Sequence, residues 1–256
     1  MKNYINTKFF LSSMIISFFE EFPTKSNLNK LSLVNKPIKL YLAARSLNEF
    51  NQIKTKINSS KIKEIVYWPI LKKEEGYWFS PFSQRKALKR IFKELNQQKG
   101  QQVPIMLDLE LPTTKNPLLY ITQITHFNFN KRIIKKFITN YEGKIYLAEY
   151  YPQNKLLLKL GLDYPNRKTQ VIKMLYHSLH DFNLQKIINK EKQKLNSRLI
   201  VALGTIAKGI NGNEKILTAK QLTDDLTICK KARIKEAIIF RLGGINKSYA
   251  DKINKF

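Results

Sequence analysis

The chain has 256 residues, 43% of them apolar, which is the length and composition of a globular protein with one large domain or two small ones. A chain of this size buries enough surface to fold without disulfides, and its single cysteine, Cys229, excludes an internal bridge and is expected to be a small buried residue. The formal net charge of +27 fits either an anionic partner or a compositional drift toward lysine.

The basic residues are spread over almost every predicted helix instead of being gathered on one face. A nucleic-acid footprint requires such clustering, and no nucleic-acid-binding motif with a known spacing occurs. We therefore favour compositional drift, and nucleic-acid binding remains possible but is not favoured.

The first apolar segment follows two lysines and resembles the apolar part of a signal peptide. Two acids and an aromatic residue precede Pro23 where a small-residue cleavage site would stand. The run is also too short to span a bilayer. We predict a first buried strand at Met14–Phe19 in a cytoplasmic protein without a transmembrane span, and an uncleaved signal or anchor is the alternative.

Seven further apolar runs follow, most of them separated by segments with helical spacing. Ser46 and Glu49 have the pattern of a capping box, and Ser83 is predicted to cap a later helix. Beyond Pro117 we predict two helices up to Tyr141, broken around 126–130. The predicted strands are Met14–Phe19, Ile38–Arg45, Ile65–Pro69, Pro104–Pro112, Lys144–Tyr151, Gln170–His177, Arg198–Thr205 and Glu236–Gly244.

Eight buried strands that alternate with helices are typical of parallel βαβ units, and eight such units fill a chain of this length. The sequence therefore predicts an α/β protein, a single (β/α)8 TIM barrel over residues 1–256. An open doubly wound sheet is the alternative, although no glycine-rich dinucleotide fingerprint marks a first βα turn. No repeat or low-complexity linker indicates a second domain.

The predicted strands end in polar or aromatic side chains, whereas their starts carry little comparable apart from Lys39, Lys63 and Glu64. The active site of a (β/α)8 barrel lies at the carboxyl ends of the strands. The sequence therefore predicts an enzyme with an acidic site at that end. The residues at the strand ends, in chain order, are Glu20 and Glu21, Arg45, Trp68, Asp108 and Glu110, Glu149, His177, Thr205 and Arg241.

Asp108 and Glu110 are two residues apart, so their side chains share one face of the strand. Neighbouring carboxylates drive their pKa values apart, which gives the acid and the base that glycosidic-bond hydrolysis needs. We predict a hydrolase of a carbohydrate or other small polar substrate, with Glu110 as general acid and Asp108 and Glu149 as partner carboxylates. The predicted substrate-binding residues are Glu20, Glu21, Arg45, Trp68, Trp78, Tyr150, Tyr176, His177 and Arg241.

Asp108-Leu109-Glu110 resembles the second half of the DxxDxDxE motif of chitinase-like family 18 glycoside hydrolases, and Met174-Leu175-Tyr176 is similar to that family's Met-x-Tyr-Asp. The resemblance implies that Glu110 is the general acid, that Asp108 orients the substrate's acetamido group and that Tyr176 supports the intermediate. It is confined to these two segments. Val103 and Met106 stand at the earlier acidic positions of the motif, and His177 replaces its aspartate.

Two other functions remain open. Gly204 and the pair Gly243-Gly244 follow the last two strands, where many barrels bind phosphate through backbone N–H groups. A metal-dependent phosphodiesterase or sugar-phosphate enzyme would use these loops together with a divalent metal held by acids and histidine. A catalytically inactive basic barrel that binds nucleic acid or acidic membrane is the second alternative. The glycosidase hypothesis needs no cofactor, and the loop 209–214 is expected to cover the site.

Overall fold

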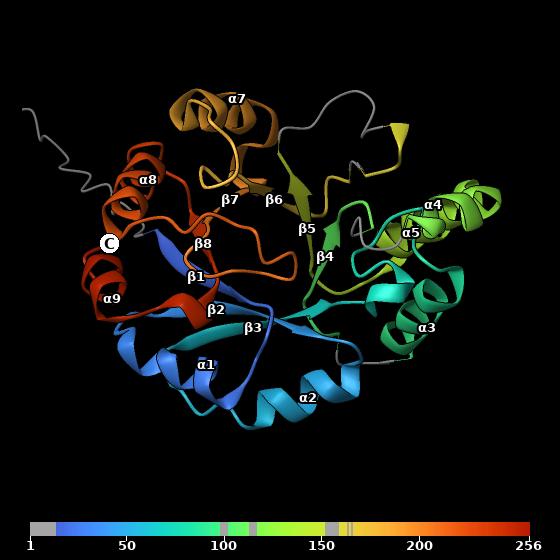
Figure 1. Ribbon diagram of the computed structural model, residues 1–256, viewed down its shortest axis with the longest axis horizontal. Helices are drawn as coiled ribbons and strands as arrows, with labels where there is room; N and C mark the ends of the chain where they lie inside the picture. Colours follow the sequence, from blue (N-terminus) through green and yellow to red (C-terminus); the bar gives the residue numbers. More distant parts are fainter. Residues whose placement is uncertain (1–13, 98–101, 113–116, 152–158, 163, 165) are drawn as a thin grey trace, which may run out of the picture.

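The computed structural model describes residues 14–97, 102–112, 117–151, 159–162, 164 and 166–256. Its strands form a closed parallel barrel in chain order, with β8 paired to β1 (Figure 1). The predicted (β/α)8 barrel is therefore confirmed. The strands are β1 (Ile15–Glu20), β2 (Ile38–Ala44), β3 (Ile62–Pro69), β4 (Ile105–Leu109), β5 (Ile145–Tyr150), β6 (Gln170–Met174), β7 (Leu199–Gly204) and β8 (Glu236–Phe240).

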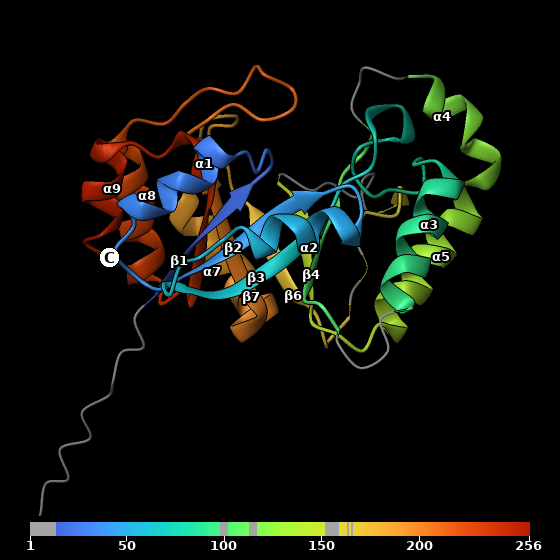
Figure 2. The same ribbon diagram turned by 90° about the horizontal axis from the view of Figure 1, so that it is seen from below.

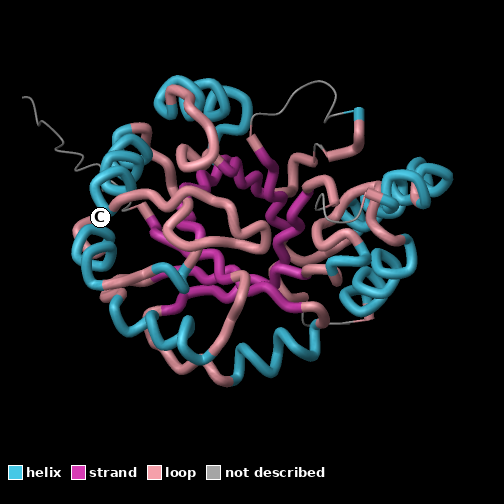
Figure 3. The backbone as a smooth tube through the Cα atoms, viewed as in Figure 1, coloured by secondary structure: helices cyan, strands magenta, loops and turns pink. Residues whose placement is uncertain are grey.

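Helices form a ring outside the strands (Figure 3). They are α1 (Lys25–Asn29), α2 (Leu47–Thr55), α3 (Arg85–Asn96), α4 (Leu118–Thr122), α5 (Phe127–Asn140), α7 (Leu184–Leu195), α8 (Ala219–Lys231) and α9 (Lys247–Ile253). Short 3-10 helices lie at η1 (Lys30–Leu33), η2 (Lys73–Glu75), η3 (Ile124–His126), η4 (Asn196–Arg198) and η5 (Leu242–Gly244). Within the described ranges, no helix is long and apolar enough to cross a membrane.

Three local predictions differ from the structure in detail. Ser46 caps α2 as expected, but the Glu49 carboxylate accepts the N–H of Arg45, at 2.7 Å. Ser83 does not cap α3, because its hydroxyl donates to the Trp78 carbonyl and accepts the N–H of Ser80. The break between α4 and α5 lies at 123–126, before the predicted place.

The strand at Met14–Phe19 is confirmed as β1, although the segment that would form a signal or anchor lies mostly in residues 1–13, outside the described residues. Cys229 is buried and free, as expected.

The core has two layers, because successive side chains of a strand point to opposite faces. Residues that face outward pack against the helices, as Phe18 and Leu40 do. Residues that face inward fill the barrel with aromatic rings: the ring of Phe19 lies 5.4 Å from that of Tyr41 and 5.5 Å from that of Trp68. The interior is therefore a packed core below the carboxyl ends of the strands.

Charged groups close the amino-terminal end of the barrel. Lys39 pairs with Glu236 at 2.6 Å and with Glu64 at 3.5 Å. The hydroxyl groups of Tyr41 and Ser17 each donate to Glu236 at 2.8 Å. The carboxylates at this end are thus matched by a cation and by hydroxyl donors. Lys39 and Glu64 stand among the polar residues at the predicted strand starts, and Glu236, the first residue of the eighth predicted strand, joins them here.

Candidate active site

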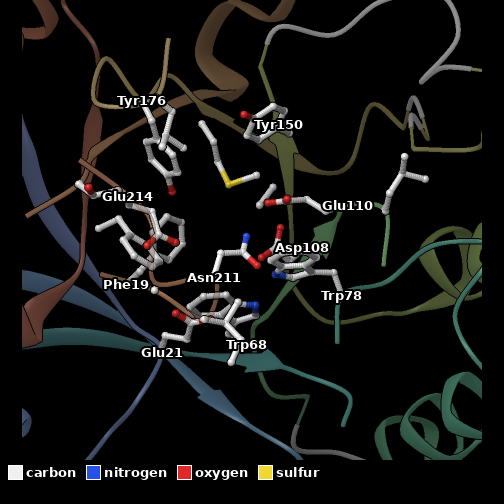
Figure 4. Close-up of a pocket in the computed structure, with 18 of the residues that line it drawn as sticks. Phe19, Glu21, Trp68, Trp78, Asp108, Glu110, Tyr150, Tyr176, Asn211 and Glu214 are labelled. Carbon is white, nitrogen blue, oxygen red and sulfur yellow. The ribbon is translucent and has the colours of Figure 1, made fainter. Parts of the chain in front are cut away.

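A pocket of about 540 Å³ opens at the carboxyl ends of the strands (Figure 4). Its walls come from seven of the strands or the loops that follow them, so segments far apart in the sequence meet there. The acids that line it are Glu21, Asp108, Glu110 and Glu214. The aromatic residues that line it are Phe19, Trp68, Trp78, Tyr120, Tyr150, Tyr176 and Phe240.

Asp108 and Glu110 form the centre of the site. Asp108 faces inward on β4, is only 4% exposed, and has one carboxyl oxygen without a hydrogen-bond partner among the described residues. Figure 4 shows its carboxyl group directed toward that of Glu110, which lies just beyond the end of β4 and is partly buried. The two side chains are hydrogen-bonded to each other.

Burial is the largest cause of the raised pKa values of both carboxyl groups. The pKa of Asp108 lies well above its ordinary value, because burial and then the charge of Glu110 disfavour its anion. Burial raises the pKa of Glu110 to about 7, even though the hydrogen bond that Asp108 donates lowers it. Near neutral pH the pair therefore holds a proton, and Glu110 is the member that can still reach a substrate.

Glu21 is a third buried acid of the pocket. It follows Glu20 at the end of β1 and faces inward, 4% exposed, where the Tyr77 hydroxyl donates to one oxygen at 2.7 Å. Its other oxygen has no hydrogen-bond partner in the described part of the chain. Burial raises the pKa of Glu21 to about 7, and the charge of Glu214 adds to the shift.

The loop between β7 and α8 crosses over the open end of the barrel. It is the orange segment at the centre of the ring in Figure 1 and the pink one at the same place in Figure 3, and Figure 2 shows it beyond the strand ends, on the same side as α4. Its Asn211 and Glu214 line the pocket, and Figure 4 shows the Asn211 side chain directed toward Asp108. The expectation that 209–214 covers the site is therefore met. Glu214 was missed as a site residue, because it lies in a loop far from any strand end.

Four of the predicted substrate-binding residues are aromatic and lie at the pocket. Trp68, Trp78, Tyr150 and Tyr176 all line the pocket. The Tyr150 hydroxyl contacts Nε2 of His180, a lining residue that the pattern of strand ends does not single out. The hydroxyl of the buried Tyr176 is directed into the cavity (Figure 4).

The prediction that Glu20 and Arg241 line the pocket is wrong. Glu20 is fully buried on the opposite face of β1 from Glu21, where it pairs with Arg241 at 3.0 Å. It also accepts the N–H groups of Phe22 at 2.8 Å and Gly243 at 2.6 Å. Its ion pair and these backbone bonds tie β1 to the segment after β8, which is a structural role.

Glu149 also lies outside the pocket, contrary to the prediction. Ala148 occupies the inward position on β5, so Glu149 faces the helices and forms a buried ion pair with Lys173 on β6. Lys173 in turn lies 3.7 Å from Glu191 of α7. A strand end alone does not decide which face its last side chain occupies.

His177 and Arg45 are likewise not in the pocket. The ring of His177 contacts Asp225 at 2.9 Å and the Phe182 carbonyl at 3.0 Å, in a separate hollow beside α8. The hydrogen bond with Asp225 raises its pKa. Arg45 is exposed and is not among the lining residues.

The glycines that a phosphate-binding site would need already make other contacts within the protein. The N–H of Gly243 is bound by Glu20. A Cβ at Gly244 would lie 2.1 Å from the Ile206 carbonyl oxygen, and one at Gly204 would lie 3.2 Å from the Tyr176 ring, so both glycines serve close packing. In the part of the chain that the structure describes, no three His, Cys, Asp or Glu side chains form a group that could hold a metal ion.

Comparisons with known proteins agree with the fold. No family model and no curated protein sequence matches the chain. The spore cortex-lytic enzyme SleL from Bacillus megaterium QM B1551 is similar in structure, with a TM-score of 0.54, 10% identity, and coverage of 95% of this chain and 74% of that one. A class V chitinase from Pseudomonas fluorescens Pf-5 has a TM-score of 0.53, 9% identity and coverage of 94% and 98%.

A D-tagatose 3-epimerase-like protein is also similar, with a TM-score of 0.57, 14% identity and coverage of 94% and 96%. At these identities the likeness shows the barrel fold alone, and chemistry has to be argued from the site.

Proposed function

We propose that the protein is a glycoside hydrolase. The observation that carries the proposal is the hydrogen-bonded pair of Asp108 and Glu110, which keeps a proton near neutral pH inside a pocket walled by aromatic rings. A glycosidase needs a protonated carboxyl group beside the leaving oxygen and negative charge beside the sugar cation. The names of the similar chitinase and cortex-lytic enzyme support the same substrate class.

In the proposed reaction, Glu110 gives its proton to the glycosidic oxygen as the bond to the sugar breaks. The hydrogen bond that Asp108 donates then stabilises the Glu110 carboxylate. The carboxylates of the pocket stabilise the positive charge that develops on the sugar. A water molecule then attacks the sugar cation and transfers a proton to Glu110. Trp68, Trp78 and Tyr150 line the pocket and supply aromatic surface against which a sugar would stack.

Replacement of the proposed acid tests this function. We expect Glu110→Gln to lower kcat by about 10²–10⁴-fold with the fold intact, because the amide keeps the shape but has no acidic proton to give. Hydrolysis of oligosaccharides, followed by chromatography, measures the loss, and circular dichroism checks the fold. Turnover retained at the level of the unsubstituted protein would refute the assignment.

The pH profile gives a second measurement. Glu110 acts in its protonated form, so kcat/KM falls as the pH rises through about 7. The charge of Glu21 raises the pKa of Glu110, so Glu21→Gln moves this limb to lower pH. A limb that does not respond to Glu21→Gln would show that another group supplies the proton.

The proposal needs no metal ion, so chelation leaves turnover unchanged. Loss of turnover on chelation, with recovery on adding one divalent cation, would favour the metal-dependent alternative.

A further inference from the structure

The pocket carries negative charge that its own lining does not balance. Four acids line it, and none of the described lining residues is lysine or arginine, although 46 of the 256 residues in the chain are one or the other. The guanidinium of Arg241 lowers the pKa of Glu21 in part, but it is bound to Glu20 and to the Lys208 carbonyl. The amino-terminal end of the barrel, where Lys39 pairs with Glu236 and Glu64, shows the opposite arrangement.

Glu21 and Glu214 flank one point of this pocket from two different elements. A Cβ added at Gly209 would lie 2.9 Å from Oε2 of Glu21 and 3.1 Å from Oε1 of Glu214. The mutual repulsion of the two carboxylates raises the pKa of Glu21, in addition to the larger effect of burial. The chain therefore holds two carboxylates close together, and burial makes the charge of Glu21 costly.

Buried carboxyl oxygens in this pocket also lack hydrogen-bond donors. Oδ1 of Asp108 and Oε2 of Glu214 have no partner among the described residues, and Oε2 of Glu21 has none within hydrogen-bonding distance, although the backbone N–H of Ile210 lowers the pKa of Glu21. A sugar hydroxyl would donate a hydrogen bond to one such oxygen but would leave the negative charge of the carboxylates unbalanced. A protonated amine brings three N–H donors and a positive charge, so it satisfies both.

Aromatic rings beside these acids strengthen the same preference. Phe19, Trp68 and Phe240 line the pocket with Glu21, and the faces of such rings attract ammonium groups. Acids and ring faces together are the surroundings that a cationic group prefers over water.

We propose that the pocket binds a carbohydrate that carries a protonated amino group, an amino sugar with a free amine, and that Glu21 and Glu214 hold the ammonium. The proposal deepens the proposed function, since it names the substrate class of the same site. It departs from the chitinase-like resemblance, in which Asp108 orients an acetamido group, because a free amine has no acetyl oxygen to orient.

Binding to the Glu110→Gln variant, measured by calorimetry at pH 7, tests the proposal without turnover. The two probes are a β-1,4-linked glucosamine tetramer and its fully N-acetylated counterpart, which share linkage and length. We expect the amine form to bind about 10- to 100-fold more tightly, the range of a charge-assisted hydrogen bond to a buried partner. Equal affinity, tighter binding of the acetylated tetramer, or no binding of either would overturn the proposal.

Variants of the two acids locate the interaction. In the Glu110→Gln background, Glu21→Gln and Glu214→Gln should each remove most of the preference for the amine form. Glu142→Gln is the matched control and should keep it, because Glu142 is exposed and precedes the first residue of β5, at the other end of the barrel. A preference that survives both substitutions in the pocket would overturn the assignment of Glu21 and Glu214.

Turnover by the unsubstituted protein separates this inference from the proposed function. Tight amine-dependent binding without cleavage of either tetramer would refute the hydrolase and leave the inference standing. Cleavage with tighter binding of the acetylated tetramer would refute the inference and leave the hydrolase standing.

Discussion

Side-chain alternation along the strands decides which acids reach the pocket. Glu20 and Glu21 are adjacent, yet one is bound to Arg241 outside the barrel and the other lies in the cavity. Asp108 and Glu110 keep the inward positions on and beyond β4, whereas Glu149 takes an outward one on β5. At the carboxyl ends of the strands, the outward-facing carboxylates Glu20 and Glu149 pair with a cation, whereas the carboxylates that line the pocket have no lysine or arginine beside them in its lining.

Glu149→Gln separates a structural acid from a catalytic one. We expect the variant to be less stable by about 1–3 kcal/mol, because a buried lysine loses its main partner but still has Glu191 at 3.7 Å. Its kcat/KM should be unchanged, because Glu149 does not line the pocket. Denaturant unfolding and oligosaccharide hydrolysis measure the two effects.

The double substitution Glu149→Gln with Lys173→Met is the control, since it removes the buried cation together with its anion and should recover part of the lost stability. If kcat/KM falls in Glu149→Gln as much as in Glu110→Gln, Glu149 takes part in catalysis and the structural assignment is wrong.

About half of the candidate site could be predicted from the sequence. The positions of Asp108, Glu110, Trp68 and Tyr176 follow from their place at or just after a strand. The errors at Glu149, His177 and Arg241 arose because a strand end in the sequence is uncertain by a residue or two, and a shift of one residue reverses the face. Glu214 and His180 could not be found, because loop geometry brings them to the pocket and no periodicity marks them.

At the scale of the elements, the covering loop is held at both ends by specific contacts. The Thr205 hydroxyl donates to the Lys215 carbonyl at 2.6 Å, and the N–H of Leu217 donates to the Thr205 carbonyl at 2.8 Å. Arg241 donates to the Lys208 carbonyl at 3.0 Å, so the segment after β8 also supports the loop. The placement of Glu214 therefore depends on β7 and on the segment that follows β8.

Gly244→Ala tests the close approach of the segment after β8 to Ile206, at the start of the covering loop. Its Cβ would lie 2.1 Å from the Ile206 carbonyl oxygen and 2.5 Å from the carbonyl carbon, and backbone atoms cannot rotate away. We expect a loss of about 2–3 kcal/mol in the free energy of unfolding, typical of overpacking at a fixed contact. Chemical denaturation of the variant measures this loss.

Gly212→Asn is the control on the same loop. Gly212 has a φ of +76° and no atom within 4 Å of an added Cβ, and asparagine tolerates this conformation. It should cost less than about 1 kcal/mol. Equal losses for Gly244→Ala and Gly212→Asn would show that the close approach of the two loops does not hold the segment in place.

At the scale of the whole molecule, the basic residues surround a cavity that is acidic. The chain has a net charge of +27, and six of its 19 acids lie at the two ends of the barrel, four in the pocket and two beside Lys39. The barrel itself could be predicted from eight apolar runs that alternate with helical segments, since the pattern of βαβ units leaves few other topologies. The division between a neutralised end and an acidic end could not, because it depends on which lysine reaches which acid.

Self-repulsion of the surface should make stability depend on salt. Raising sodium chloride from 10 to ~200 mM screens surface charges beyond a Debye length, and we expect a gain of about 1 kcal/mol, or ~2–4 °C in Tm for a chain of this size. Differential scanning calorimetry measures the shift. A neutral solute at equal osmolality is the control, and a Tm that does not rise with salt would show that the surface lysines are already balanced.

The ion cluster of Lys39, Glu64 and Glu236, with the aromatic layer above it, closes the barrel at its amino-terminal end, so the pocket is open at the carboxyl ends of the strands. Under the proposed function, a product would therefore have to leave by the same opening through which the substrate enters. A polymer could not pass from one end of the barrel to the other, so in the described part of the molecule each product would compete with the next substrate for the opening beside the loop 209–214.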